Sequence, residues 1–133
     1  MEIIDMQDQK SQSDASSVQA SNGMDTISYD DFAKLDIRIG TVVAAELVPE
    51  TDKLIKCTID FGEMGTRTIV SGIALFRNPE ELVGKQLPYI VNLAPRILRG
   101  VESQGMLLAA SPGGEGLALL IPDNPVPNGT KLK

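Results

Sequence analysis

Two arginines beside turn-forming residues are the part of this chain best suited to binding an anion. Arg96 follows a proline and Arg99 precedes a glycine, so both lie where the backbone is expected to turn. A guanidinium presents several N–H donors in a plane that matches phosphate oxygens. Asn92 and Ser103 could add neutral hydrogen bonds to phosphate, ribose or base edges. On composition alone, the alternative is a hairpin whose arginines are merely solvated.

The rest of the composition leaves little room for catalysis or metal binding. The chain has no histidine and a single cysteine, Cys57. Nucleophile arrangements that need histidine are therefore excluded, and a structural zinc site lacks its usual ligands. There is also no P-loop pattern and no D-x-D run that could serve as a metal-ligand motif. We expect a protein that is not an enzyme, with no catalytic residues, no metal and no cofactor.

The charge is distributed unevenly along the chain. The net charge is −6, and five of the 18 acidic residues but only one of the 12 basic residues fall in residues 1–26. Residues 27–133 therefore hold 13 acidic and 11 basic residues, so this part of the chain is nearly neutral. Any surface that binds nucleic acid must then be a local basic patch.

The first 26 residues differ in composition from the rest. They are rich in Ser, Gln, Asp and Ala and could bury little apolar surface, so we expect a disordered tail or linker at 1–26 and one domain at 27–133. No stretch is long and apolar enough to cross a membrane, and no secretory signal is recognisable. Together with the lone cysteine, these features predict a cytoplasmic protein.

Residues 27–133 alternate in the manner of a β-protein. Ser28 is expected to cap a short helix, and Asn78, with Pro79 and Glu81, a second. Period-two patterns predict strands at about 37–45, 54–61, 66–70, 86–93, 106–110 and 117–121. In the first, Gly40 indicates a bend or bulge, and Arg38 is expected to face outward, opposite its isoleucine neighbours.

Three strands, a short helix and two further strands are typical of the OB-fold, a five-stranded Greek-key barrel. The expected fold class is therefore all-β with short helices, followed by a C-terminal extension. Lys53, Lys56 and Arg67 lie on or beside the strands that form the usual binding face of such barrels, although they could equally be solvated surface. Met106 opens an apolar strand and could belong to the core instead.

Several blocks, in order along residues 27–133, resemble one family. They are DIRIG at 36–40, DKL at 52–54, RTIVSGI at 67–73, PEELVGK at 79–85, and NLAPR, LRG and SQGMLLA between 92 and 109. The match is to the tRNA-binding domain at the C-terminus of many bacterial methionyl-tRNA synthetases. The same domain occurs as a free-standing protein and in eukaryotic synthetase-associated factors.

The resemblance implies an OB barrel that binds tRNA by shape and backbone, usually dimerises, and assists a synthetase catalytic chain. It makes Asn92, Arg96, Arg99, Ser103 and Met106 candidates to line the RNA surface. The catalytic motifs of the synthetase are absent, so this chain is not expected to aminoacylate by itself. The few aromatic residues also argue against stacking of successive bases and for recognition of folded RNA.

The alternative is a protein-interaction module of the same fold, either a dimerisation appendix or a chaperone-like binder. The apolar stretch at 117–126 is its best feature. The secretion-chaperone branch generally lacks the Ser-x-Gly-Met block found here at 103–106, which favours the synthetase branch. The chain departs from the family in having Val48-Pro49 where a His-Pro is common.

Overall fold

The computed structural model describes residues 25–133 of the chain. The chain divides into two units, and the sheet belongs to the second, Asp36–Lys133. In the first unit, the short helix α1 (Tyr29–Ala33) begins after Ser28, whose hydroxyl accepts a hydrogen bond from the Asp31 N–H at 3.1 Å. The predicted cap is thus confirmed. The predicted tail at 1–26 lies, up to residue 24, outside the described residues.

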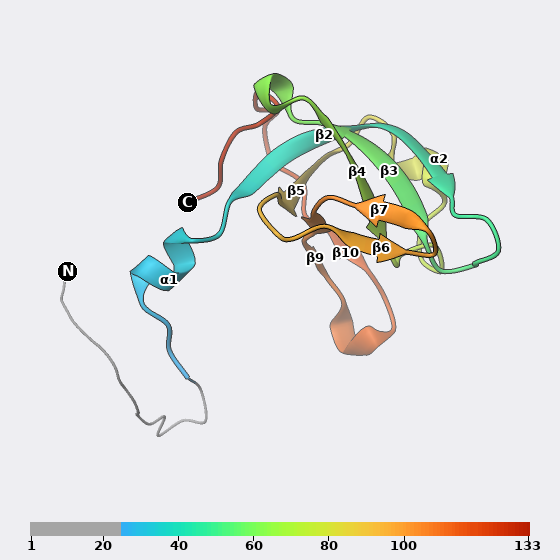
Figure 1. Cartoon of the computed structure of the whole chain (residues 1–133), viewed down its shortest axis with the longest axis horizontal. Helices are drawn as coiled ribbons and strands as arrows, with labels where there is room; N and C mark the ends of the chain where they lie inside the picture. Colours follow the sequence, from blue (N-terminus) through green and yellow to red (C-terminus); the bar gives the residue numbers. More distant parts are fainter. Residues whose placement is uncertain (1–24) are drawn as a thin grey trace. The chain divides into compact units, whose positions relative to one another are not determined.

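Five antiparallel strands form the main sheet of the second unit, in the order β4-β3-β2-β5-β8 (Figure 1). They are β2 (Ile37–Leu47), β3 (Ile55–Asp60), β4 (Thr66–Ser71), β5 (Gln86–Ile90) and β8 (Met106–Leu107). The outer strands approach each other where Gln104 donates its N–H to the Thr68 carbonyl at 2.8 Å. The sheet therefore curls into a partly closed barrel, and the predicted OB-type, all-β fold is confirmed.

Strand β2 is long because it serves two partners. Its first half, from Ile37 to Thr41, pairs with β5, and its second half, from Thr41 to Leu47, pairs with β3. The register with β3 shifts between Val42 and Ala44, so a bulge lies two residues beyond the predicted glycine bend. Gly40 itself faces the core, where a Cβ would meet a side-chain atom of Ile59 at 2.5 Å.

The alternation of β3 determines what fills the barrel. Ile55, Cys57 and Ile59 are buried as predicted, and Phe61, just after the strand, packs edge-to-face on Tyr89 with ring centroids 5.7 Å apart. Burial raises the pKa of the Cys57 thiol to about 11. The single cysteine is therefore a core residue and no reactive nucleophile at neutral pH.

Two short helical turns connect these strands. The 3₁₀ turn η1 (Gly62–Met64) closes the β3–β4 hairpin, between the strands predicted at 54–61 and 66–70. Helix α2 (Pro79–Leu82) begins after Asn78, whose N–H donates to the Glu81 carboxylate at 3.4 Å, the return half of the predicted capping box. Leu82 from this helix is buried in the core, and the helix contacts β2.

The later strands are shorter than the sequence pattern predicts. The strand expected at 106–110 is split, because β8 pairs with β5 whereas β9 (Ala109–Ala110) pairs with β10 (Ala118–Leu119). Between β9 and β10 lies the 3₁₀ turn η2 (Pro112–Gly114). The strand expected at 86–93 ends at Ile90. Two residues later the Asp36 N–H donates to the side-chain oxygen of Asn92 and not to its backbone carbonyl, so the backbone pairing does not continue.

The C-terminal extension covers the free edge and the outer face of β2. The Gly129 N–H donates to the Ile39 carbonyl at 2.7 Å, and the Leu132 N–H donates to the Ile37 carbonyl at 2.8 Å. On the outer face, the Gln86 side chain donates to the Val126 carbonyl at 2.6 Å. The C-terminal extension therefore pairs with the first half of β2, on the edge that β3 does not reach.

Candidate nucleic-acid interface

The segment that carries Arg96 and Arg99 is a β-hairpin of its own. Strand β6 (Arg96–Leu98) pairs with β7 (Val101–Ser103) across a two-residue turn. The turn residues Arg99 and Gly100 have φ of 51° and 80°, and positive values at both positions are typical of a type I′ hairpin turn. The sequence predicted a turn here but did not resolve the two strands.

Both arginines of this hairpin are available to a ligand. The side chains of Arg96 and Arg99 are exposed, and neither forms a hydrogen bond or ion pair with another residue of the described part of the chain. Ile97 between them is also exposed. The hairpin thus offers two free guanidinium groups on a turn whose backbone conformation is defined by Gly100.

Ser103 and Gln104 attach the hairpin to the barrel. Ser103 is only 3% exposed; its hydroxyl accepts the Val70 N–H at 2.9 Å and donates to the Gly105 carbonyl at 3.3 Å. The Gln104 side-chain oxygen accepts the Thr68 N–H at 3.0 Å. The Ser103 hydroxyl is therefore engaged inside the fold, where it anchors β7 to β4.

Gly105 lets the chain pass close to the core after this anchor. A Cβ at this position would lie 2.8 Å from the Ile90 carbonyl oxygen and 2.9 Å from a side-chain carbon of Ile69. Any side chain at this position would therefore collide with the backbone of β5. Met106, the next residue, is 40% exposed at the start of β8, so it is neither fully core nor fully surface.

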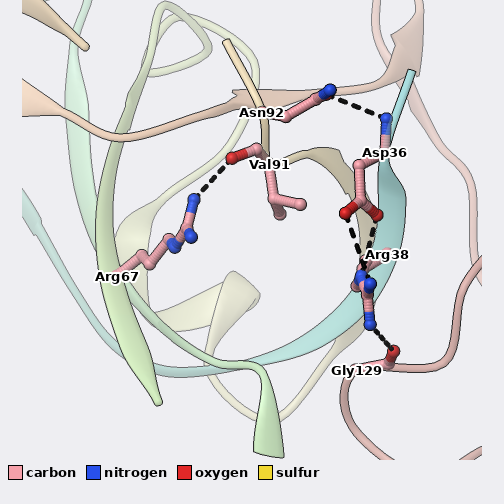
Figure 2. A network of polar contacts seen from close by, with 6 residues as sticks. All are labelled: Asp36, Arg38, Arg67, Val91, Asn92 and Gly129. Carbon is pink, nitrogen blue, oxygen red and sulfur yellow. Dashed lines mark hydrogen bonds and ion pairs between the residues drawn. The ribbon is translucent and has the colours of Figure 1, made fainter. Parts of the chain in front are cut away.

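Arg67 lies on the inner side of β4, at the open end of the barrel (Figure 2). Its neighbour across the sheet is Ile59, and Ile69 on the same face is fully buried. The Arg67 guanidinium donates to the Val91 carbonyl at 2.5 Å and to the Gln104 carbonyl at 3.4 Å. Arg67 is consequently bound to the protein backbone.

Asp36 and Arg38 form a second polar contact at the same end of the barrel (Figure 2). Two nitrogens of Arg38 donate to the two carboxylate oxygens of Asp36 at 2.8 and 3.3 Å, and Arg38 also donates to the Gly129 carbonyl at 3.2 Å. The Asp36 N–H donates to the Asn92 side-chain oxygen at 2.8 Å. The start of the hairpin segment is therefore tied to β2 and, through it, to the C-terminal extension.

The prediction that Arg38 faces outward is wrong. Arg38 stands opposite the core residue Tyr89, so it lies on the inner face at the rim of the barrel. Ile37 and Ile39 are buried on the other face, along which the C-terminal extension runs. Period-two alternation correctly separates the two faces of β2. It does not show that the barrel core covers one face and the C-terminal extension the other.

The Asp36–Arg38 pair predicts an acid-sensitive contribution to stability. The hydrogen bond from Arg38 holds the pKa of Asp36 below its ordinary value of 3.8. A lowered pKa means that the stabilisation is complete at neutral pH and is lost as the pH falls through the pKa of the folded state. Asp36→Asn should lower the free energy of unfolding by about 1 kcal/mol at neutral pH, because a charged hydrogen bond is lost.

Urea unfolding at neutral pH and near pH 3 measures this difference, with Asp52→Asn on an exposed turn as the control. The gap between Asp36→Asn and the wild type should narrow on acidification, whereas the control should match the wild type at both pH values. A gap that is independent of pH would show that the carboxylate charge is not what stabilises the contact.

The two predicted lysines lie on or near β3. Lys53 is exposed in the turn before the strand, and Lys56 forms an ion pair with Glu46 at 3.6 Å on the outer face. Lys56 pairs with Val70 of β4, and Val70 also bonds to β7, so a single strand separates Lys56 from the hairpin. Lys53 and Lys56 could therefore extend the surface on which Arg96 and Arg99 lie.

Within residues 25–133, no group of His, Cys, Asp and Glu residues could hold a metal ion. Over the same residues, no helix is both long and apolar enough to cross a membrane.

Comparison with known proteins identifies the family. Residues 37–131 match a family model described as "Putative tRNA binding domain". The chain belongs to this tRNA-binding domain family. The matched range begins at the first residue of β2 and ends inside the C-terminal extension, so the whole barrel of the family domain is present.

Several relatives are methionine–tRNA ligases. The chain is 46% identical over 132 residues to the ligase of Porphyromonas gingivalis and 52% identical over 107 residues to that of Bacteroides fragilis. It spans only 19% and 16% of the length of these relatives. The tRNA-binding domain is therefore a small part of these ligases.

Solved structures give the same fold. A protein related to methionyl-tRNA synthetase from Pyrococcus horikoshii superimposes with a TM-score of 0.79 at 42% identity, covering 83% of this chain and all of that one. The chaperone CsaA of Bacillus anthracis superimposes with a TM-score of 0.75 at 38% identity, covering 82% of this chain and all of that one. The family domain thus occurs in proteins with two different descriptions.

Sequence reasoning missed the anchoring roles of Asp36, Arg38 and Arg67. One signal was present: Asp36 and Arg38 are two residues apart in a strand, so their side chains share a face and can pair. The hydrogen bonds of Arg67 join residues 24 and 37 positions away, and no local pattern predicts them.

Proposed function

We propose that this chain binds tRNA by its shape and phosphate backbone, with the β6–β7 hairpin as the centre of the contact surface. The proposal rests on the exposed guanidinium groups of Arg96 and Arg99, which have no side-chain partner among the described residues. They lie in a domain of a tRNA-binding family. Arginine forks match phosphate oxygens, and backbone contacts position a protein on RNA without reading its sequence.

Other predicted residues take different parts in this proposal. Lys53 and Lys56 extend the surface along β3, and Met106 borders it with its exposed portion. Arg67 and Ser103 hold the hairpin in place, since their polar atoms are bound within the fold. Asn92 is exposed, and its side chain also accepts a hydrogen bond from the Asp36 N–H. It is therefore proposed both to border the RNA surface and to help hold the hairpin.

The proposal predicts binding that weakens steeply with salt. Phosphate contacts release condensed counterions, so the logarithm of the binding constant should fall linearly with the logarithm of salt concentration. Fluorescence anisotropy with labelled tRNA across a salt series measures this dependence. No shift at low salt with micromolar protein would refute tRNA binding.

We further propose that the domain assists a methionyl-tRNA synthetase, as an appended domain or as a partner subunit, by raising its affinity for tRNA. The relatives named methionine–tRNA ligase support this role. Adding the chain to a synthetase catalytic fragment should lower KM for tRNA without changing kcat. A homodimer in the cytoplasm is part of the same proposal, and light scattering across a concentration series tests the dimer.

A protein-interaction module is the second candidate function. It is favoured by the similarity to a protein described as the chaperone CsaA and by the exposed apolar residues Leu120 and Ile121, which follow β10. Binding of unfolded polypeptide, with no binding of tRNA at low salt, would select this candidate over the first.

A further inference from the structure

One guanidinium group joins the two ends of the segment that carries the hairpin. Val91 is the residue just before this segment, and Gln104 is its last residue. Arg67 donates to the carbonyl oxygens of both, at 2.5 and 3.4 Å. Figure 2 shows the Arg67 side chain reaching from β4 across the open end of the barrel to Val91.

The β6–β7 hairpin is attached to the barrel through the two ends of residues 92–104. Strands β6 and β7 form a separate two-stranded sheet, and neither belongs to the five-stranded sheet of the barrel. An isolated two-stranded hairpin is marginally stable in water. The direction in which Arg96 and Arg99 point must therefore depend on how the two ends of residues 92–104 are held.

Both ends are also attached to the barrel separately. At the start, the Val91 N–H donates to the Asp36 carbonyl at 2.8 Å and the Asp36 N–H donates to the Asn92 side chain. At the end, Thr68 exchanges hydrogen bonds with the backbone and side chain of Gln104, and the Ser103 hydroxyl accepts a backbone N–H of β4. These contacts bind the two ends to different parts of the barrel, whereas the Arg67 guanidinium contacts both ends.

We propose that Arg67 is a positioning residue for tRNA binding. It joins the two ends of residues 92–104 and thereby holds the β6–β7 hairpin in the orientation that meets the RNA. This inference rests on the proposed function. One terminal nitrogen of Arg67, Nη1, donates to both backbone carbonyls, so its proposed effect on RNA passes through Arg96 and Arg99. An arginine suits this position because its planar, pre-organised guanidinium holds this nitrogen between the two acceptors, whereas a lysine ammonium ends a flexible stem.

Hydrogen exchange in the free protein tests the clamp without RNA. Arg67→Met keeps the aliphatic stem and removes the donors, and it should speed exchange of amides in 96–103 while β2 and β3 stay protected. Lys85→Met, which removes one positive charge just before β5 and outside residues 92–104, should leave the hairpin unchanged. Unchanged exchange of the hairpin in Arg67→Met would overturn the proposal.

Affinity for labelled tRNA tests whether the effect passes through the hairpin arginines. Arg67→Met should weaken binding about tenfold in the wild-type background, and much less in a variant that already carries Arg96→Gln and Arg99→Gln, because coupled residues are not additive. If Arg67→Met weakens tRNA binding by the same factor in both backgrounds, Arg67 contacts RNA directly, and the inference is overturned.

If Arg67→Met does not fold, Arg67→Lys replaces it as the test variant. Lysine retains the charge but donates less well to both carbonyls. The rate of hairpin amide exchange and the tRNA affinity should therefore lie between those of the wild type and those expected for Arg67→Met. Wild-type affinity in Arg67→Lys with unchanged hairpin exchange would show that charge alone matters. If wild-type protein binds no tRNA, the proposed function fails, and the exchange experiment still decides whether Arg67 holds the hairpin.

Discussion

Reversing the charge of the two hairpin arginines, in Arg96→Glu with Arg99→Glu, is expected to lower tRNA affinity at low salt by about a hundredfold or more. Each arginine is proposed to make a charged hydrogen bond to phosphate, worth about 1.5–3 kcal/mol, and about 1.4 kcal/mol corresponds to a factor of ten. The salt dependence should change as well. The slope of log affinity against log salt should become shallower by about two, because two phosphate contacts are lost.

The matched control reverses the same amount of charge elsewhere. Lys131 and Lys133 are both exposed on the C-terminal extension, so Lys131→Glu with Lys133→Glu gives the same net charge as the hairpin variant. Equal loss of affinity in the two variants would show that net charge governs binding and that the hairpin has no special part. The hairpin variant should also weaken binding to several tRNA species alike, since backbone contacts carry little sequence information.

The strands of the barrel could be predicted from the sequence because their signals are local. Ile55, Cys57 and Ile59 alternate with polar residues, so they share one apolar face of β3, and that face is the core. The helix caps at Ser28 and Asn78 depend on residues only three positions apart. Such patterns require no knowledge of which segments meet in space.

The errors arise where distant segments meet. Arg38 was expected to face solvent because alternation with two isoleucines suggests one buried face. The C-terminal extension buries the isoleucine face as well, and residue 129 is 91 positions from Arg38. The strand expected at 106–110 was split for a related reason, because its two halves pair with different strands.

The candidate site can be predicted in part. The chemistry of Arg96 and Arg99 and the turn residues beside them indicate an exposed basic site, and both side chains are exposed in the structure. The strands β6 and β7 are not predicted, since their turn places the non-glycine residue Arg99 at a positive φ, which is uncommon. The family resemblance indicates Ser103 and the strand position indicates Arg67, but whether a polar side chain is hydrogen-bonded within the fold depends on residues distant in sequence.

The position of Gly40 makes a further strong prediction, for stability rather than binding. A Cβ on Gly40 would lie 2.5 Å from a methyl carbon of Ile59 and 2.7 Å from the ring of Phe61. Both neighbours are fully buried, so neither can move without displacing others in a close-packed interior. Overpacking of this kind costs about 1–3 kcal/mol and sometimes more, and we expect Gly40→Ala to lie at or above about 3 kcal/mol.

Gly72 provides the control for this substitution. Its backbone φ is not in the left-handed region, and a Cβ there would have its nearest neighbour at 3.9 Å, an ordinary contact. Gly72→Ala should therefore leave stability unchanged or raise it by about 0.4–1 kcal/mol, because alanine restricts the unfolded chain. Urea unfolding of the three proteins measures both effects, and equal stability of Gly40→Ala and wild type would contradict the packing described for β2. Gly40 is then a position of β2 where even a methyl side chain is too large for the core.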